Sequence, residues 1–123
     1  MLAVSEIDKI VINTDARHIL EEKGLTESKK IATIADTFHV PISFHNTKGP
    51  IGILAAAHLE ASIPNPAPME FVTGIDWRDE IIDEPLCVEE GRLVLPTRPG
   101  LGVKLNMEGI EAHRWRSGDS RSG

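Results

Sequence analysis

The sequence predicts an α/β fold in which a βαβαβ unit with parallel strands is followed by an antiparallel hairpin and an extended C-terminal segment. Three short apolar runs have the length and composition of buried strands. Two segments of helical length separate the runs, and such connections join parallel strands through right-handed crossovers. After the third run the pattern changes to two short strands around a turn. The three runs are residues 9–13, 40–44 and 68–72.

The segment between the first two runs predicts an amphipathic helix. Thr26 is a suitable N-cap, and the acidic Glu27 suits the first turn. The apolar residues that follow are spaced i, i+3, i+4 and i+7, which is typical of one helix face. They are Ile31, Ile34, Ala35 and Phe38. We expect this face to pack against the sheet.

The segment between the second and third runs predicts a helix that is buried on most sides. Pro50 stands where a helix would begin, and the sequence IGILAAAHLEASI that follows it is apolar almost throughout. Pro64, Pro66 and Pro68 end this helix, because proline cannot continue one. The third predicted strand, PMEFV, then runs from Pro68 to Val72.

The C-terminal third of the chain has a different organisation. Leu86–Val88 and Leu93–Leu95 flank the sequence EEG, which predicts a hairpin. Residues 96–106, PTRPGLGVKLN, are punctuated by proline and glycine and predict an extended return segment. Met107–Trp115 is expected to form a short terminal helix, and the polar tail at residues 114–123 is expected to be flexible.

Composition and charge narrow the possible partners. The chain has 123 residues and a net charge of −6, so neither nucleic acid nor an anionic membrane is an expected partner. Cys87 is the only cysteine, which rules out an internal disulfide and fits a reducing compartment. The start of the sequence lacks the pattern of a signal peptide, and no apolar run reaches membrane-spanning length. We therefore expect a cytoplasmic location.

An ionisable residue lies at the end of, or within, each predicted strand. Asp15 follows the first strand, His45 follows the second and Glu70 lies in the third. The carboxyl ends of parallel strands meet at one edge of a sheet, so these groups are expected to converge there. A carboxylate beside a histidine can fix the imidazole tautomer, which leaves the other ring nitrogen to transfer a proton. A buried glutamic acid across the site could donate to a developing oxyanion.

Simpler interpretations of these residues remain open. An acid at a strand end often caps the next helix, and a single histidine there is more often structural than catalytic. His58 lies within the apolar helix and is expected to be a core residue with satisfied hydrogen bonds. His39 precedes a strand, which places it at the end of the strand opposite to the one where barrel enzymes bind their ligands. Metal-ligand spacing is poor, because the chain contains neither HxxxH nor CxxC. The sequence therefore predicts no metal site within this chain.

Two long motifs resemble a known family. Residues 24–52, GLTESKKIATIADTFHVPISFHNTKGPIG, are similar to the end of an enolase-superfamily barrel of the mandelate racemase/muconate lactonizing enzyme type. Residues 77–106, WRDEIIDEPLCVEEGRLVLPTRPGLGVKLN, are similar to the final segment of the same family. Within it, the chain most resembles acid-sugar dehydratases of the galactonate type. The resemblance implies strands six to eight of a (β/α)₈ barrel, which needs roughly 250 residues when complete.

The resemblance also implies chemical roles. Asp15 and His45 match the family's base pair, and Glu70 matches the glutamate that hydrogen-bonds the substrate carboxylate as it becomes an enediolate. The substrate would be a sugar acid, and the reaction would be dehydration or racemisation. The family uses Mg²⁺, whose ligands lie on strands outside this chain. The same likeness divides the chain at residues 1–72, 73–113 and 114–123: a partial barrel, a return segment packing toward a capping domain, and a tail.

Two functions therefore remain open. The chain could supply the C-terminal part of a magnesium-dependent acid-sugar dehydratase or racemase. Alternatively, it could be a truncated, catalytically inactive member of the family that lacks the metal site. Its partners would be a small sugar acid together with a missing N-terminal portion, or further copies of itself, because open sheet edges favour association.

Overall fold

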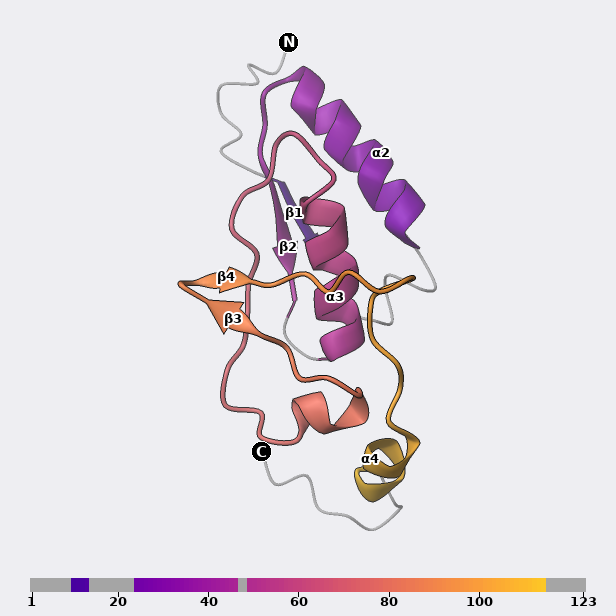
Figure 1. The fold of residues 1–123 in the computed structure, drawn as a ribbon. Helices are drawn as coiled ribbons and strands as arrows, with labels where there is room; N and C mark the ends of the chain where they lie inside the picture. The colour runs from indigo at the N-terminus through magenta and orange to yellow at the C-terminus, as the bar shows by residue number, and fades with distance from the viewer. Residues whose placement is uncertain (1–9, 14–23, 47–48, 115–123) are drawn as a thin grey trace.

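The computed structural model describes residues 10–13, 24–46 and 49–114. These residues form a small α/β unit followed by a long C-terminal arm, residues 73–113 (Figure 1). No helix in these residues is long and apolar enough to cross a membrane. In chain order the elements are β1 (Ile10–Asn13), α2 (Gly24–Thr37), β2 (Ile42–His45), α3 (Pro50–Glu60), the 3-10 helix η3 (Arg78–Ile81), β3 (Val88–Glu89), β4 (Arg92–Leu93) and α4 (Met107–Ala112).

The first two strands pair in parallel, as the helix-length connection predicts. The register runs from Ile10 opposite Ile42 to Asn13 opposite His45. The end of β1 therefore lies beside the end of β2, at the carboxyl edge of this small sheet. Asp15 lies outside the described residues.

The third predicted strand is wrong as a regular strand, although the segment does lie beside β2. A single parallel bridge joins Ile42 to Pro66. Ala67 and then Glu70, three positions later, supply the N–H groups that reach β2, so the bonds do not follow the two-residue step of a regular ladder. The backbone hydrogen bonds between the segment and β2 are Ile42 N–H to Asn65 O (2.8 Å), Ala67 N–H to Ile42 O (2.7 Å) and Glu70 N–H to Phe44 O (3.1 Å).

Helix α2 forms where the sequence predicts it, but the predicted buried face is partly wrong. Ala35 is buried, whereas Ile34 is 62% exposed and Phe38 is 53% exposed. The buried residues of α2 are the small ones, Ser28, Ala32 and Ala35, and the two alanines pack in the main hydrophobic cluster with β2. The larger apolar residues Ile34 and Phe38 lie on a flank of the helix that the described residues leave uncovered.

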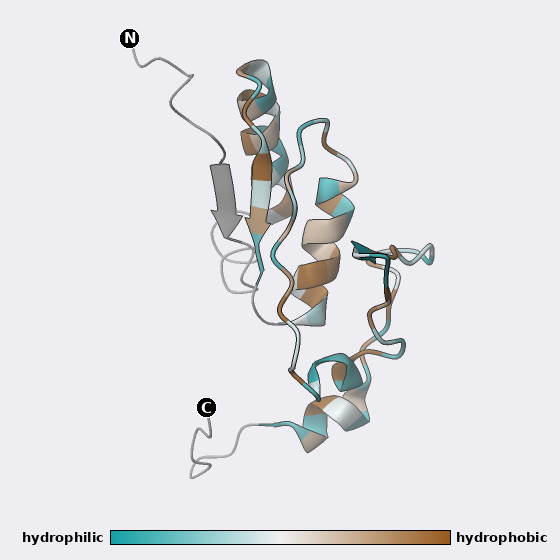
Figure 2. Ribbon diagram, turned by 90° about the vertical axis from the view of Figure 1, so that its left-hand side faces the viewer, coloured by the Kyte–Doolittle hydropathy of each residue, from teal (hydrophilic) through white to brown (hydrophobic). Residues whose placement is uncertain are grey.

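Helix α3 is buried on most sides, as its composition predicts. Its buried residues include Ala56 and Leu59, which pack with Ile42 and Phe44 of β2 in the main hydrophobic cluster. Figure 2 shows hydrophobic colouring over much of both elements. His58 is half-buried rather than a core residue, and its Nε2 donates a hydrogen bond to the Leu101 carbonyl oxygen (3.2 Å). This contact ties the C-terminal arm to α3.

The hairpin predicted around EEG is confirmed. Strands β3 and β4 are antiparallel, with Val88 opposite Leu93 and Glu89 opposite Arg92. The turn uses Glu90 (φ 49°) and Gly91 (φ 76°), both in the left-handed region that favours glycine. The arm therefore contributes a separate two-stranded sheet and adds no strand to the parallel pair.

Helix α4 docks against η3 at the far end of the arm (Figure 1). The Asn106 side-chain amide donates to the Glu80 carbonyl oxygen (2.8 Å), and His113 Nε2 pairs with the Glu80 carboxylate (2.7 Å). The His113 ring also stacks on Trp77, with 5.0 Å between the centroids. A Cβ atom on Gly109 would lie 2.0 Å from the Glu80 carbonyl oxygen, so this close approach requires glycine.

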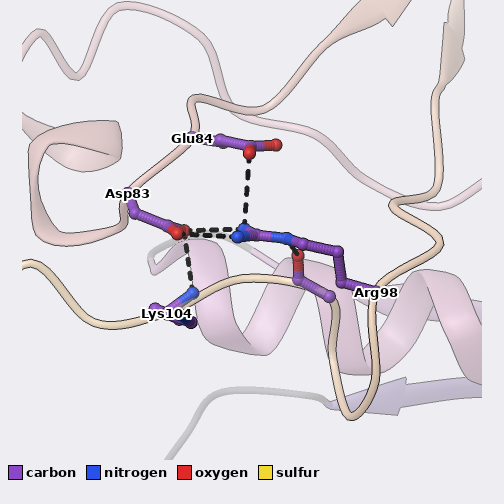
Figure 3. A network of polar contacts seen from close by, with 5 residues as sticks. Asp83, Glu84, Arg98 and Lys104 are labelled. Atoms are coloured by element: carbon purple, nitrogen blue, oxygen red, sulfur yellow. Dashed lines mark hydrogen bonds and ion pairs between the residues drawn. The ribbon is translucent and has the colours of Figure 1, made fainter.

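A charged cluster joins the part of the arm before the β3–β4 hairpin, at Asp83 and Glu84, to the part after it, at Arg98 and Lys104 (Figure 3). The Arg98 guanidinium donates two hydrogen bonds of 2.9 Å to the Asp83 carboxylate, which also accepts from the Lys104 backbone N–H (2.8 Å). Arg98 also donates from Nε to the Gly102 carbonyl oxygen (2.8 Å), and Glu84 lies 3.6 Å away. The hydrogen bonds from Arg98, followed by that from Lys104, hold the pKa of Asp83 down at about 2.

We expect Gly109→Ala to destabilise the arm by roughly 1–3 kcal/mol, because the added methyl group cannot be accommodated without moving α4 off η3. Unfolding in urea, followed by tryptophan fluorescence, measures the effect. Glu108→Ala, at an exposed position of the same helix, is the matched control and should change stability by less than about 0.5 kcal/mol. Equal stability of the two variants would contradict the docking.

Asp83 should make the stability of the chain depend on pH in the acid range. Its pKa in the folded state is lowered to about 2 from an ordinary 3.8, so its contribution is fully present above about pH 4 and is lost as pH falls toward 2. Urea midpoints of the unaltered chain and of Asp83→Asn should therefore differ above pH 4 and converge near pH 2. A difference that is constant across this range would show that the carboxylate charge is not responsible.

Candidate active site

His45 is the last residue of β2 and faces away from the helices. Ile42 and Phe44 point to the side on which α2 and α3 pack, because both belong to the main hydrophobic cluster. Side chains alternate along a strand, so Ser43 and His45 lie on the opposite face. Ser43 is 5% exposed, whereas the His45 side chain is 39% exposed. The histidine thus lies at the solvent-exposed carboxyl end of an otherwise buried strand.

Glu70 reaches His45 from the neighbouring segment. The Glu70 backbone N–H donates to the Phe44 carbonyl oxygen, which fixes its place beside the end of β2. Its Oε2 then forms a hydrogen bond with His45 Nδ1. The Glu70 side chain is 54% exposed. The structure therefore brings two of the three predicted site residues into direct contact, on the same face and at the same edge.

This contact has a defined chemical consequence. When Glu70 is ionised, it can only accept, so His45 Nδ1–H donates to Oε2. The contact with Glu70 then favours the proton on Nδ1, and Nε2 is the ring nitrogen that could transfer a proton to or from a ligand. A histidine held in this way can act as a general base near neutral pH.

Among the described residues, the carboxylate that contacts His45 is that of Glu70. Since Asp15 lies outside the described residues, the expected His45–Asp15 pair stays a prediction. The Glu70 side chain lies beside that of His45 rather than across from it, and its role as a hydrogen-bond donor to the substrate stays a prediction. The two side chains lie side by side because the segment that carries Glu70 runs directly beside β2.

Two polar residues beside the site are not found by looking for ionisable residues at strand ends. Ser43 Oγ donates to the Pro68 carbonyl oxygen (2.9 Å) on the face that carries His45. Asn46 directly follows His45, is 2% exposed, and its Nδ2 has no hydrogen-bond partner. The available signal is a polar residue inside or just after an otherwise apolar strand, which by itself does not indicate a role.

A magnesium site does not follow from the described residues. In this part of the chain, no three His, Cys, Asp or Glu side chains gather closely enough to hold a metal ion. A cavity of about 550 Å³ between α3 and the hairpin belongs to a different region. Its lining includes Met69 and Leu93, but neither His45 nor Glu70. Glu60 lies at this cavity, and burial raises the pKa of its carboxyl group.

Comparison with known proteins identifies the family. The family described as "Enolase C-terminal domain-like" matches residues 11–109. A D-xylonate dehydratase from Haloferax volcanii is 35% identical over 91 residues, covering 73% of this chain and 22% of that enzyme. A D-gluconate dehydratase from Thermoproteus tenax is 31% identical over 106 residues, covering 85% of this chain and 21% of that enzyme. The chain thus spans less than a quarter of either of these two relatives.

Solved structures give the same result. A Burkholderia xenovorans structure bound to magnesium and fumarate matches with a TM-score of 0.75 and 27% identity, covering 89% of this chain and 26% of that one. A mandelate racemase/muconate lactonizing enzyme-like protein from Rubrobacter xylanophilus matches with a TM-score of 0.75 and 29% identity, covering 88% and 27%. These matches imply an α/β barrel as the parent fold. The chain belongs to the enolase superfamily and corresponds to a C-terminal fragment of its mandelate racemase/muconate lactonizing enzyme-type barrel domain.

Proposed function

We propose that this chain contributes His45, Glu70 and Asp15 to the active site of an acid-sugar dehydratase or racemase that removes the proton α to a carboxylate. The observation that supports it best is the His45–Glu70 contact at the carboxyl edge of the parallel strands. In α/β barrels this edge carries the chemistry. The register of β1 adds support, since Asn13 lies opposite His45 and Asp15 follows two residues later.

The first step follows from the tautomer of His45. The α C–H bond breaks, the proton moves to Nε2, and the electron pair passes into the carboxylate to form an enediolate. In a dehydratase the bond from the β carbon to its hydroxyl then breaks, and His45 returns the proton so that water leaves. A racemase instead returns a proton to the α carbon. A positioned base of this kind contributes on the order of 10²–10⁴ in rate.

The substrate class rests on the relatives. D-xylonate and D-gluconate, the substrates in the names of two relatives, are sugar acids with a hydroxyl group on the carbon next to the carboxylate. The family is magnesium-dependent, and one matching structure contains magnesium. Because the described residues of this chain do not form a metal site, the ligands of such an ion would come from elsewhere in the active protein.

Residues 73–113 are proposed to pack toward a second domain. Several large apolar side chains on this arm are exposed, including Trp77 (48%), Leu105 (56%) and Met107 (66%). Exposed apolar groups gathered on one segment are typical of a surface that another part of a protein covers. A capping domain, as the resemblance implies, would bury them.

A hybrid enzyme tests the proposed function. The matching segment of the Haloferax volcanii D-xylonate dehydratase is replaced by the corresponding residues of this chain, and D-xylonate consumption is measured with magnesium present. We expect turnover that falls by about 10²-fold or more in His45→Asn. His58→Asn is the matched control, because His58 bonds only a carbonyl oxygen of the arm on the other side of the sheet. A hybrid that folds but stays inactive would favour the inactive-fragment alternative.

The isolated 123-residue chain is expected to be inactive toward sugar acids, with or without magnesium. Its described residues offer a base and a carboxylate but no cluster that would hold a metal ion. The measurement is exchange of the α proton in heavy water across a panel of sugar acids, together with a test for 2-keto-3-deoxy products. Exchange that exceeds buffer and disappears in His45→Asn would overturn this expectation.

A further inference from the structure

The segment that carries Glu70 contains one more residue than a regular parallel ladder allows. Ala67 N–H donates to the Ile42 carbonyl, and Glu70 N–H donates to the Phe44 carbonyl. Successive bonds in a parallel ladder advance by two residues on each strand. Here β2 advances by two residues and the segment by three, so the segment bulges at Pro68 and Met69.

The bulge determines which way Glu70 points. Side chains on the segment alternate, and one extra residue exchanges the two faces beyond it. Met69 accordingly packs on the hydrophobic cluster beside α2 and α3, whereas Glu70 meets His45 on the opposite face. In a regular ladder Met69 N–H would bond the Phe44 carbonyl instead. Glu70 would then point toward the helices, and Met69 would lie beside His45.

Ser43 holds this bulge through its side chain. Its hydroxyl is buried between the strand and the segment and donates to the carbonyl oxygen of Pro68, inside the bulge (2.9 Å). The Ser43–Pro68 bond lies two residues before the His45–Glu70 contact on both partners. It therefore holds the segment inside the bulge, between the backbone bonds of Ala67 and Glu70 to β2.

We propose that Ser43 is a positioning residue that selects the register in which Glu70 meets His45. This inference rests on the proposed function for its catalytic meaning, but the geometry stands without it. Ser43 touches no reacting atom in this scheme, and it acts through the Pro68 carbonyl. Loss of the hydroxyl leaves the bulge without its side-chain bond, so Glu70 spends less time at Nδ1 of His45.

The ¹⁵N chemical shifts of the His45 ring measure this directly, because they report the ratio of the Nδ1–H to the Nε2–H tautomer. We expect Nδ1–H to dominate in the unaltered chain at neutral pH. In Ser43→Ala the ratio should fall about three- to ten-fold, the range expected for loss of one hydrogen bond. Ser43→Thr keeps the hydroxyl and should retain the ratio. Ser43→Cys, with a weaker donor, should fall in between and serves if Ser43→Ala does not fold.

Ser62→Ala is the matched control. Ser62 Oγ also donates to a backbone carbonyl, that of Leu59 (2.7 Å), but it lies after α3, on the helix side of the sheet. Its removal should leave the His45 tautomer ratio unchanged while circular dichroism confirms folding of every variant. If Ser43→Ala and Ser62→Ala give the same ratio as the unaltered chain, Ser43 has no positioning role.

The two proposals can fail separately. Tautomer ratios do not depend on turnover, so they decide the role of Ser43 even if the hybrid enzyme is inactive. In an active hybrid, Ser43→Ala should lower kcat about three- to ten-fold with little change in KM, whereas Ser62→Ala should change neither. An active, His45-dependent hybrid that Ser43→Ala leaves unaffected would overturn the positioning role and leave the proposed function standing.

Discussion

The hydrogen bonds between β2 and the segment that follows α3 determine where Glu70 meets His45, the contact on which the proposed function rests. They fix Glu70 at the end of β2. The same bonds keep Met69 on the hydrophobic cluster, so packing on one face and the polar pair on the other depend on a single register. Among the described residues, three backbone hydrogen bonds join β2 to this segment, so each of them has more influence on the register than a bond in a longer ladder.

The parts of the fold that can be predicted from the sequence are those set by local pattern. Helix-length connections between apolar runs indicate parallel strands, and EEG between two apolar pairs indicates a hairpin. The buried face of α2 cannot be obtained in this way. Phe38 lies about 180° around the helix from Lys29, whose ammonium bonds Ser62 just beyond α3 (3.0 Å to Oγ). The position of α3 thus decides which flank of α2 is covered, and this is information from tertiary structure.

The candidate site, too, can be predicted in part from local pattern and depends in part on tertiary structure. A histidine after one apolar run and a glutamate within another suffice to predict convergence at one edge. The partner of the imidazole does not follow from this, because it depends on which segment lies adjacent to β2. Nor does the bulge follow, since residues 69–72, MEFV, have the composition of a short strand whether or not the pairing contains an extra residue. Ser43 acquires meaning only when the Pro68 carbonyl is seen beside it.

Burial changes sharply along the face of β2 that carries Ser43 and His45. The Ser43 side chain is almost completely buried, whereas His45, one step further along the same face, is well exposed. Among the described residues, α2 and α3 both pack on the other face of the strand. Proton removal from carbon needs a site from which water is largely excluded, because a lower dielectric strengthens every charge interaction within it. In a closed barrel the face that carries Ser43 and His45 is the interior, and its carboxyl edge is the rim where substrates bind. Closure of the barrel would therefore cover the inner face of β2 and, at the same rim, exclude water from the His45–Glu70 pair.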